Sequence, residues 1–185
     1  MPRNSSYKRQ EDFFDTCSRC KTNYSCCNDT TPPITDERRR IIETYLKKEK
    51  IPVKDVFVET DYVFPRLVEG GYCIFHDKKT RKCLIHAVKP ETCVAGPVTF
   101  DINVRNRRIE WFIKKDSLCQ LAGVVHEDKT RLWRHLESAK MEILRLVREL
   151  DAKALKAILT KDEPETFKID KDKISEAVLE KLVQK

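Results

Sequence analysis

Hydrophobic positions recur at helical spacing through the last third of the chain. They form one apolar stripe from Asp128 or Thr130, where a helix could begin, to about Leu150. Two shorter amphipathic segments follow, at residues 152–159 and 174–183. This pattern predicts a long helix and two short ones, each with an apolar face to bury.

The middle of the chain alternates apolar and polar positions, as strands do. Residues 98–104 and 109–113 alternate on either side of a polar turn, which predicts a β-hairpin with one apolar face. Residues 72–75 and 82–85 predict a second, shorter hairpin with residues 76–81 as its turn. This shorter hairpin would bring together two cysteines, one from each strand.

A further helix is predicted upstream of these strands. Thr35 or Asp36 can cap a helix that ends near Lys50, just before a proline. Residues 53–58 follow as a short extended stretch. Residues 89–92 predict a tight turn or a short helix that presents the cysteine after it.

Eight cysteines are the main chemical feature of the chain. Half of them lie within eleven residues, and the other four are single and well spread. We expect the chain to fold so that all of them gather around metal. Thiolates suit zinc or an iron–sulfur cluster, and the ligand type alone does not separate the two. The candidate metal ligands are Cys17, Cys20, Cys26, Cys27, Cys73, Cys83, Cys93 and Cys119.

Two spacings in the first group favour metal. Cys17 and Cys20 form a Cys-x2-Cys pair, in which both thiolates can face one ion or cluster. Cys26 and Cys27 are adjacent, so their side chains would point to opposite sides of an extended backbone. This favours two centres, or one large cluster approached through a bent backbone. Two four-cysteine sites would use every cysteine, and one cluster with unused thiols is the alternative.

The cellular compartment decides how these cysteines are interpreted. No run of about 18 apolar residues occurs, and residues 1–10 lack the apolar core of a signal peptide. We therefore expect a cytoplasmic protein with no membrane partner. Thiols stay reduced in the cytosol, so metal binding is favoured over disulfides.

The four histidines and the basic charge say less about the metal site and the partners than the cysteines do. His76 and His86 lie near the second group of cysteines, but each has a simpler local role, and His126 and His135 are expected on the surface. The formal charge of +7 would fall once thiolates bind metal, so nucleic acid is not the favoured partner. The C-terminal helices could instead cap the metal domain or dock a protein partner.

The order of the cysteines is similar to that of a known family. The pattern is Cys17-x2-Cys20-x5-Cys26-Cys27, then Cys73-x9-Cys83, then Lys89-Pro90-x2-Cys93, and finally Cys119. It resembles the CxxCxxxCC cysteine-cluster family of the YkgJ type, a zinc- or iron-chelating domain, over about residues 13–122.

The resemblance has two consequences. His76 and His86 stand where that family usually has Leu and Tyr, which argues against a ligand role. One branch resembles flagellin lysine methylases, which implies an iron–sulfur enzyme that uses S-adenosylmethionine. The four glycines of this chain form no convincing nucleotide-binding turn, so the transfer of that activity is weakly supported.

These observations predict an α+β fold. We expect an arm at residues 1–12, a small cysteine-rich metal-binding domain with short β-hairpins at 13–125, and a helical extension at 126–185. The favoured function is a metal-binding protein holding an iron–sulfur cluster, of 4Fe–4S type, or zinc, in electron transfer, sensing or metal handling. The alternatives are a structural zinc protein that binds a macromolecular partner, and a lysine methylase-like enzyme.

Overall fold

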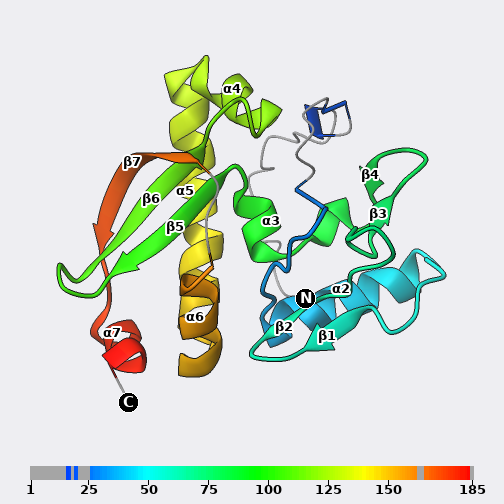
Figure 1. Ribbon diagram of the computed structural model, residues 1–185, viewed down its shortest axis with the longest axis horizontal. Coiled ribbons are helices and arrows are strands. Elements are labelled where there is room, and N and C mark those ends of the chain that lie inside the picture. The colour runs from blue at the N-terminus through cyan, green and yellow to red at the C-terminus, as the bar shows by residue number, and fades with distance from the viewer. Residues whose placement is uncertain (1–15, 18, 21–25, 162–164, 184–185) are drawn as a thin grey trace, which may run out of the picture.

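The computed structural model describes residues 16–17, 19–20, 26–161 and 165–183. Within them the chain forms an α+β fold, in which helices are mixed with small antiparallel sheets (Figure 1). This confirms the predicted fold class. The predicted N-terminal arm lies outside the described residues.

The largest sheet has three antiparallel strands in the order β5-β6-β7. Strands β5 (Val98–Asn103) and β6 (Arg108–Lys114) form the predicted hairpin. Val98 pairs with Ile113 in this hairpin, and these apolar residues are buried on the same face. The alternating pattern therefore located both strands correctly.

Strand β7 (Thr166–Lys173) was not predicted and lies in the segment that was expected to be helical. It pairs antiparallel with β6. The Lys140 ammonium lies 2.5 Å from an Asp170 carboxylate oxygen and 2.9 Å from one of Asp172. The Trp111 indole N–H donates to Asp172 over 2.6 Å. In the sequence these charged residues show no strand pattern. Contacts with Lys140 and Trp111, which are distant in the chain, hold them in a strand.

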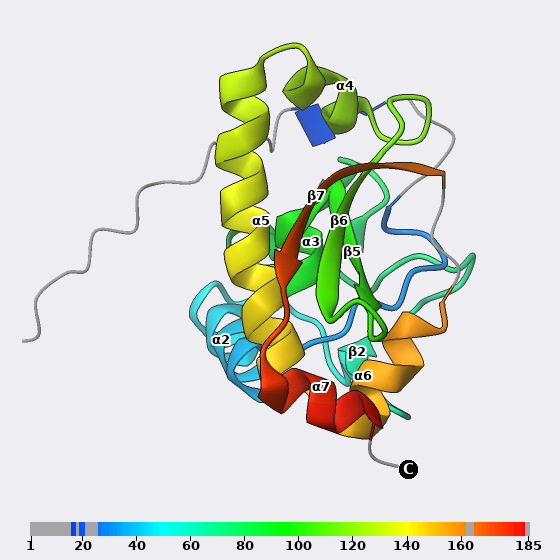
Figure 2. The ribbon, with the colours of Figure 1, turned by 90° about the vertical axis from the view of Figure 1, so that its left-hand side faces the viewer.

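The long C-terminal helix packs along the sheet. It is α5 (Lys129–Glu149), and the Asp128 side chain caps it by accepting from the Thr130 and Arg131 N–H groups. Helices α6 (Ala152–Leu159) and α7 (Glu176–Val183) follow (Figure 2). All three were predicted, and α7 begins two residues later than expected.

These elements share the largest hydrophobic cluster of the described residues. Its buried members include Tyr62, Ala95, Val98, Ile102, Ile109, Trp111, Leu136, Ala139, Ile143, Leu146, Val147, Leu150, Ala154, Leu155, Ile174, Val178 and Leu179. The cluster contains residues from both sides of the domain boundary predicted at residue 125. That boundary stays a prediction.

The other half of the fold is built around α2 (Asp36–Lys48). The Thr35 side chain caps this helix by accepting from the Arg38 N–H, as the sequence indicated. Strands β1 (Phe57–Glu59) and β2 (Val63–Pro65) form a small hairpin, which begins later than the stretch expected at 53–58. A second hydrophobic cluster lies here, formed by Ile34, Ile42, Leu46, Val56, Phe75 and Ile85.

The predicted cysteine hairpin is shorter and shifted. Its strands are β3 (His76–Asp77) and β4 (Lys82–Cys83), with His76 opposite Cys83. His76 therefore lies in a strand, not in the turn as predicted. Cys73 pairs with Leu67 instead. The backbone around Cys73 bonds elsewhere, which shortens the hairpin.

Short helices lie between the two halves. The 3₁₀ helix η1 (His86–Val88) is followed by α3 (Glu91–Ala95), which confirms the predicted short helix that carries Cys93. Helix α4 (Gln120–His126) was not predicted. A third hydrophobic cluster forms around it, from Ile113, Leu121, Ala122 and Val125. In the part of the chain that the structure describes, no helix is both long and apolar enough to cross a bilayer.

We predict that Ile143→Ala lowers the free energy of unfolding by about 2–4 kcal/mol, because it leaves a cavity in the largest cluster. Ile143 is 1% exposed, whereas Met141 on the same helix is 68% exposed. Met141→Ala should therefore change stability by less than about 0.5 kcal/mol. Urea denaturation followed by circular dichroism measures both. Equal effects of the two substitutions would contradict the packing of α5 described here.

Candidate metal centre

Four separate parts of the chain carry the eight cysteines, and the fold brings them together. The N-terminal segment carries four, the region around β3 and β4 carries two, α3 carries one and the residue before α4 carries one. The thiolate charge of Cys26 acts on the thiols of Cys17, Cys83, Cys93 and Cys119. Cys26 therefore lies at the centre of the cysteine group.

Backbone hydrogen bonds join the first and second groups of cysteines. The Cys73 N–H donates to the Cys27 carbonyl over 2.7 Å, and the Asp29 N–H donates to the Gly71 carbonyl over 2.8 Å. Asn28 and Tyr72 form an antiparallel bridge between these two bonds. This pairing occupies the backbone that the sequence had assigned to the cysteine hairpin.

Gly71 makes this pairing possible. Its φ of +75° is one that side chains rarely adopt, and a Cβ there would lie 2.0 Å from an Asp29 carboxylate oxygen. A larger residue would have to displace the Asp29 and Asn28 side chains. Gly71, two residues before Cys73, is therefore a site of close approach between the two segments.

Cys26 and Cys27 lie in a turn, and their side chains hydrogen-bond to each other. From the sequence we expected either an extended backbone with opposed side chains or a bent backbone, and the structure shows the bent one. The hydrogen bond from Cys27 lowers the pKa of Cys26 to about 6, although burial opposes this. The same bond, with burial, raises the pKa of Cys27. The pair therefore shares one proton and presents one thiolate.

Most of the remaining thiols are neutral near pH 7. Burial raises the pKa of Cys17 and of Cys73 to about 11, and it also raises the pKa of Cys83, Cys93 and Cys119. Backbone N–H groups partly offset this effect, from Phe75 for Cys73 and from Ile85 for Cys83. Both donors lie two residues after the cysteine, so the two segments present their sulfurs in the same way.

Two lysines supply positive charge to the group. The Lys89 charge lowers the pKa of Cys17, Cys26, Cys83 and Cys93, in each case as a smaller effect than another cause. The Lys114 charge acts on Cys26 and Cys119. Both cations favour the thiolate forms, which are the forms that bind metal.

The donor set is all thiol. Over the described residues, no three or more His, Cys, Asp or Glu side chains are already arranged to hold one ion. The cysteines are therefore neighbours, but they do not form a closed coordination sphere. The donors still match zinc or an iron–sulfur cluster, since each of these is held by four cysteine thiolates in many proteins.

One histidine, His135, departs from the prediction. His76 stacks on Tyr72, with ring centroids 5.0 Å apart, and His126 is exposed. His135 was expected on the surface but is only 4% exposed. Its Nε2 lies 3.0 Å from the Ala95 carbonyl oxygen. Its position between Leu132 and Leu136 on the apolar stripe was the signal for burial.

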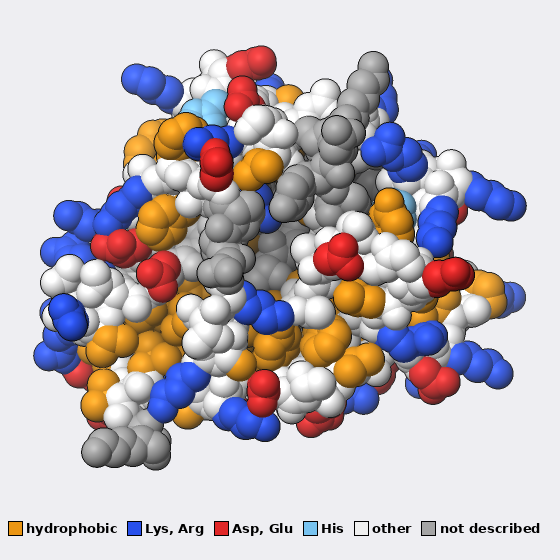
Figure 3. All heavy atoms as spheres, in the orientation of Figure 1, with side chains coloured by type: hydrophobic (Ala, Val, Ile, Leu, Met, Phe, Trp, Pro, Cys, Tyr) orange, Lys and Arg blue, Asp and Glu red, His pale blue; other side chains and the backbone are white. Residues whose placement is uncertain are grey.

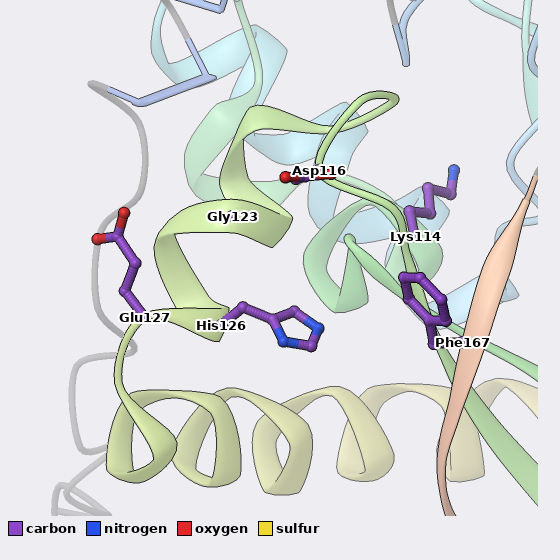
Figure 4. Close-up of a pocket in the computed structure, with 6 residues that line it drawn as sticks. All are labelled: Lys114, Asp116, Gly123, His126, Glu127 and Phe167. Atoms are coloured by element: carbon purple, nitrogen blue, oxygen red, sulfur yellow. The ribbon is translucent and has the colours of Figure 1, made fainter.

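A hollow of about 520 Å³ lies at the C-terminal end of α4, between this helix and β7 (Figure 4). The His126 and Phe167 side chains point into the space between the two elements, and Glu127 points away. Lys114 lines the hollow and also acts on Cys26 and Cys119, which places the hollow beside the cysteine group. Its lining includes a basic side chain, Lys114, and two acidic ones, Asp116 and Glu127.

Comparison with known proteins gives two matches. A family model described as "Putative zinc- or iron-chelating domain", with the signature CxxCxxCC, matches residues 16–120. An uncharacterized protein of Methanocaldococcus jannaschii is 33% identical over 99 residues, which are 48% of this chain and 50% of that protein. The chain thus spans about half the length of this curated relative.

No solved structure matches the chain. The family match covers more than half of the chain and contains all eight cysteines. The gap between Cys20 and Cys26 is longer in this chain than in the family signature. The chain belongs to the CxxCxxCC family of zinc- or iron-chelating domains.

Proposed function

We propose that this chain holds a 4Fe–4S iron–sulfur cluster at the cysteine group and uses it in electron transfer, sensing or metal handling. The observation that carries the proposal is that Cys26 hydrogen-bonds to Cys27 and that its charge acts on four further thiols, those of Cys17, Cys83, Cys93 and Cys119. Zinc at the same thiols is the alternative, and metal analysis separates the two.

Four of the cysteines are the best candidates for the ligands of the cluster. The thiols of Cys26, Cys27, Cys83 and Cys93 all act on one another electrostatically. We call these residues the inner quartet. Cys17, Cys73 and Cys119 interact with only part of it. Four thiolates complete a 4Fe–4S cluster, so the inner quartet supplies the required number of ligands.

The turn at Cys26 and Cys27 does not by itself select a cluster. The two sulfurs hydrogen-bond to each other, and two thiolates bound to one tetrahedral zinc ion are similarly close together. A 4Fe–4S cluster carries its four thiolates on separate iron atoms, so binding it would draw these two sulfurs apart. Zinc at this pair is therefore the alternative that metal analysis has to exclude.

When bound, an iron–sulfur cluster supplies one-electron redox chemistry. The chain provides the thiolates, and Lys89 and Lys114 offset part of their negative charge. The Phe75 and Ile85 backbone N–H groups are directed at the cysteines that precede them. Such donors are expected to influence a reduction potential.

The shared proton of Cys26 and Cys27 indicates an order of ligand ionisation. Cys26 is the thiol that is already ionised near neutral pH, so it would bind metal first. The thiols with a raised pKa would lose their protons as the metal replaces them. Because burial raises their pKa, metal affinity should fall as the pH is lowered.

The first prediction concerns the metal. Protein purified without oxygen should contain about four iron atoms and four acid-labile sulfides per chain, with broad visible absorption that bleaches on reduction. Elemental analysis, sulfide assay and absorption spectra measure this. Colourless protein with stoichiometric zinc would instead support the structural zinc alternative.

The second prediction concerns the ligands. Replacing any member of the inner quartet with serine should lower the iron content by at least about half, because one corner of the cluster loses its thiolate. Cys119→Ser is the matched control, because Cys26 is the quartet member whose charge acts on the Cys119 thiol. Equal loss of iron from C119S and C83S would contradict the assignment.

The third prediction concerns pH. In metal-free protein under reducing conditions, the alkylation rate of Cys26 should rise with a midpoint near pH 6, while that of Cys73 rises near pH 11. Cys27→Ala should move the Cys26 midpoint up towards about 8.5, because the hydrogen bond to the thiolate is lost. Mass spectrometry of the labelled peptides measures the rates.

Cys73→Ala is the control for this experiment, because Cys73 responds to Cys83 and not to Cys26. It should leave the Cys26 midpoint unchanged. A Cys26 midpoint above pH 8 in the unaltered protein would overturn the shared proton.

A further inference from the structure

We propose that α5 is a positioning element for the metal centre: together with α2, it holds both ends of the short helix α3 and so fixes Cys93. The inference rests on the proposed function, because Cys93 belongs to the inner quartet. Helix α5 lies outside residues 16–120, the part that the family model matches. The inference therefore gives the C-terminal region a role at the cysteine site.

Helix α3 has too little structure of its own to set the position of Cys93. It is five residues long, and the only side chains that it buries almost completely are Glu91 and Ala95. Isolated helices of this length are unstable, so their neighbours determine where they lie. Figures 1 and 2 both show α3 alongside α5, and the two helices are in contact.

The C-terminal end of α3 is held by His135 of α5. The Nε2 atom lies 3.0 Å from the Ala95 carbonyl oxygen and 3.1 Å from that of Gly96. A carbonyl oxygen can only accept, so Nε2 carries the proton and donates to both. These carbonyls belong to the end of a helix, where backbone acceptors lack partners within the helix.

The N-terminal end of α3 is held by a buried ionic network. The Glu91 side chain is fully buried and accepts a hydrogen bond from the Thr35 hydroxyl over 2.7 Å. Arg38 of α2 lies 3.7 Å from Glu91 and donates to the Lys89 carbonyl over 3.1 Å. Burial raises the pKa of Glu91, and Thr35 and Arg38 oppose this.

Helix α5 closes this network from the other side. Arg38 donates to the Glu142 carboxylate over 2.7 Å, and Arg145 pairs with the same carboxylate. Glu142 is 18% exposed and Arg38 is 11% exposed, so water screens these charges only partly. Glu142 therefore fixes Arg38, and Arg38 fixes the segment from Lys89 to Glu91, just before Cys93.

The spacing of these contacts along α5 allows this helix to hold both ends of α3. His135 and Glu142 are seven residues apart, two turns along one face of α5. Their contacts reach opposite ends of α3, with Cys93 between them. A displacement of either end would move the Cys93 sulfur relative to Cys26, Cys27 and Cys83.

The test uses paired substitutions at His135. His135→Leu removes the donor while keeping an apolar volume, and His135→Gln restores an amide N–H near the position of Nε2. Leu155→Ala is the control for lost stability, since Leu155 is buried in the same hydrophobic cluster but lies on α6. Two readouts are needed, one without metal and one with it.

Without metal, the readout is the alkylation rate of Cys93 relative to that of Cys73 in the same molecule. We expect His135→Leu and Glu142→Gln to raise this ratio at least about fivefold, and His135→Gln to stay near the unaltered value. With metal, the rate of iron release to a chelator should rise in the same two variants. Leu155→Ala should lower the melting temperature without changing either readout.

Two results would overturn the inference. The first is an unchanged Cys93 ratio and iron-release rate in His135→Leu, with only a lower melting temperature, because the contact would then serve stability alone. The second is an equal change in Leu155→Ala, because the effect would then follow any loss of stability. Unaltered protein that binds neither iron nor zinc would overturn the proposed function itself, and it is recognised before any variant is compared.

Discussion

Two backbone hydrogen bonds, between residues 27–29 and residues 71–73, join the halves of the cysteine group. Each partner segment is too short to form a sheet by itself, and the pairing requires the close approach that Gly71 allows. The bonds place Cys27 beside Cys73, whose segment packs on the second hydrophobic cluster. The first group of cysteines is thereby attached to a folded core.

Four of the cysteines lie against or beside the three hydrophobic clusters. Cys73 and Cys83 pack on the second cluster, Cys119 packs on the third, and Cys93 is two residues before Ala95 of the largest. This setting removes water from the thiols, which raises the pKa of most of them. Ionising a group of partly buried thiols is unfavourable without positive charge nearby, and a bound metal would provide that charge.

The side chains of the protein supply only part of this positive charge. Lys89 and Lys114 both act on Cys26, which the hydrogen bond from Cys27 already favours as a thiolate. On the face seen in Figure 3, Lys and Arg side chains lie at both edges and also within the face, interspersed with acidic ones. That face shows no single basic stripe of the kind that follows a nucleic-acid backbone.

Sequence alone was sufficient for elements with a strong period, and it named the candidate ligands. The helices at 36–48 and 129–149, and the hairpin of β5 and β6, follow from apolar spacing and from caps at Thr35 and Asp128. The eight cysteines were recognised as one group from their number, their spacing and the expected compartment. That they approach one another is now supported by their electrostatic interactions, while their role as ligands remains a proposal.

Tertiary structure decided what local pattern could not. Strand β7 has few apolar residues, and its Asp170 and Asp172 are held by Lys140, thirty residues away in the case of Asp170. The bent turn at Cys26 and Cys27 decided between the two backbones expected there, because the chain there pairs with residues 71–73. His135 became a buried donor because α3 packs on α5. In each case the deciding partner lies far along the chain, so no local period could reveal it.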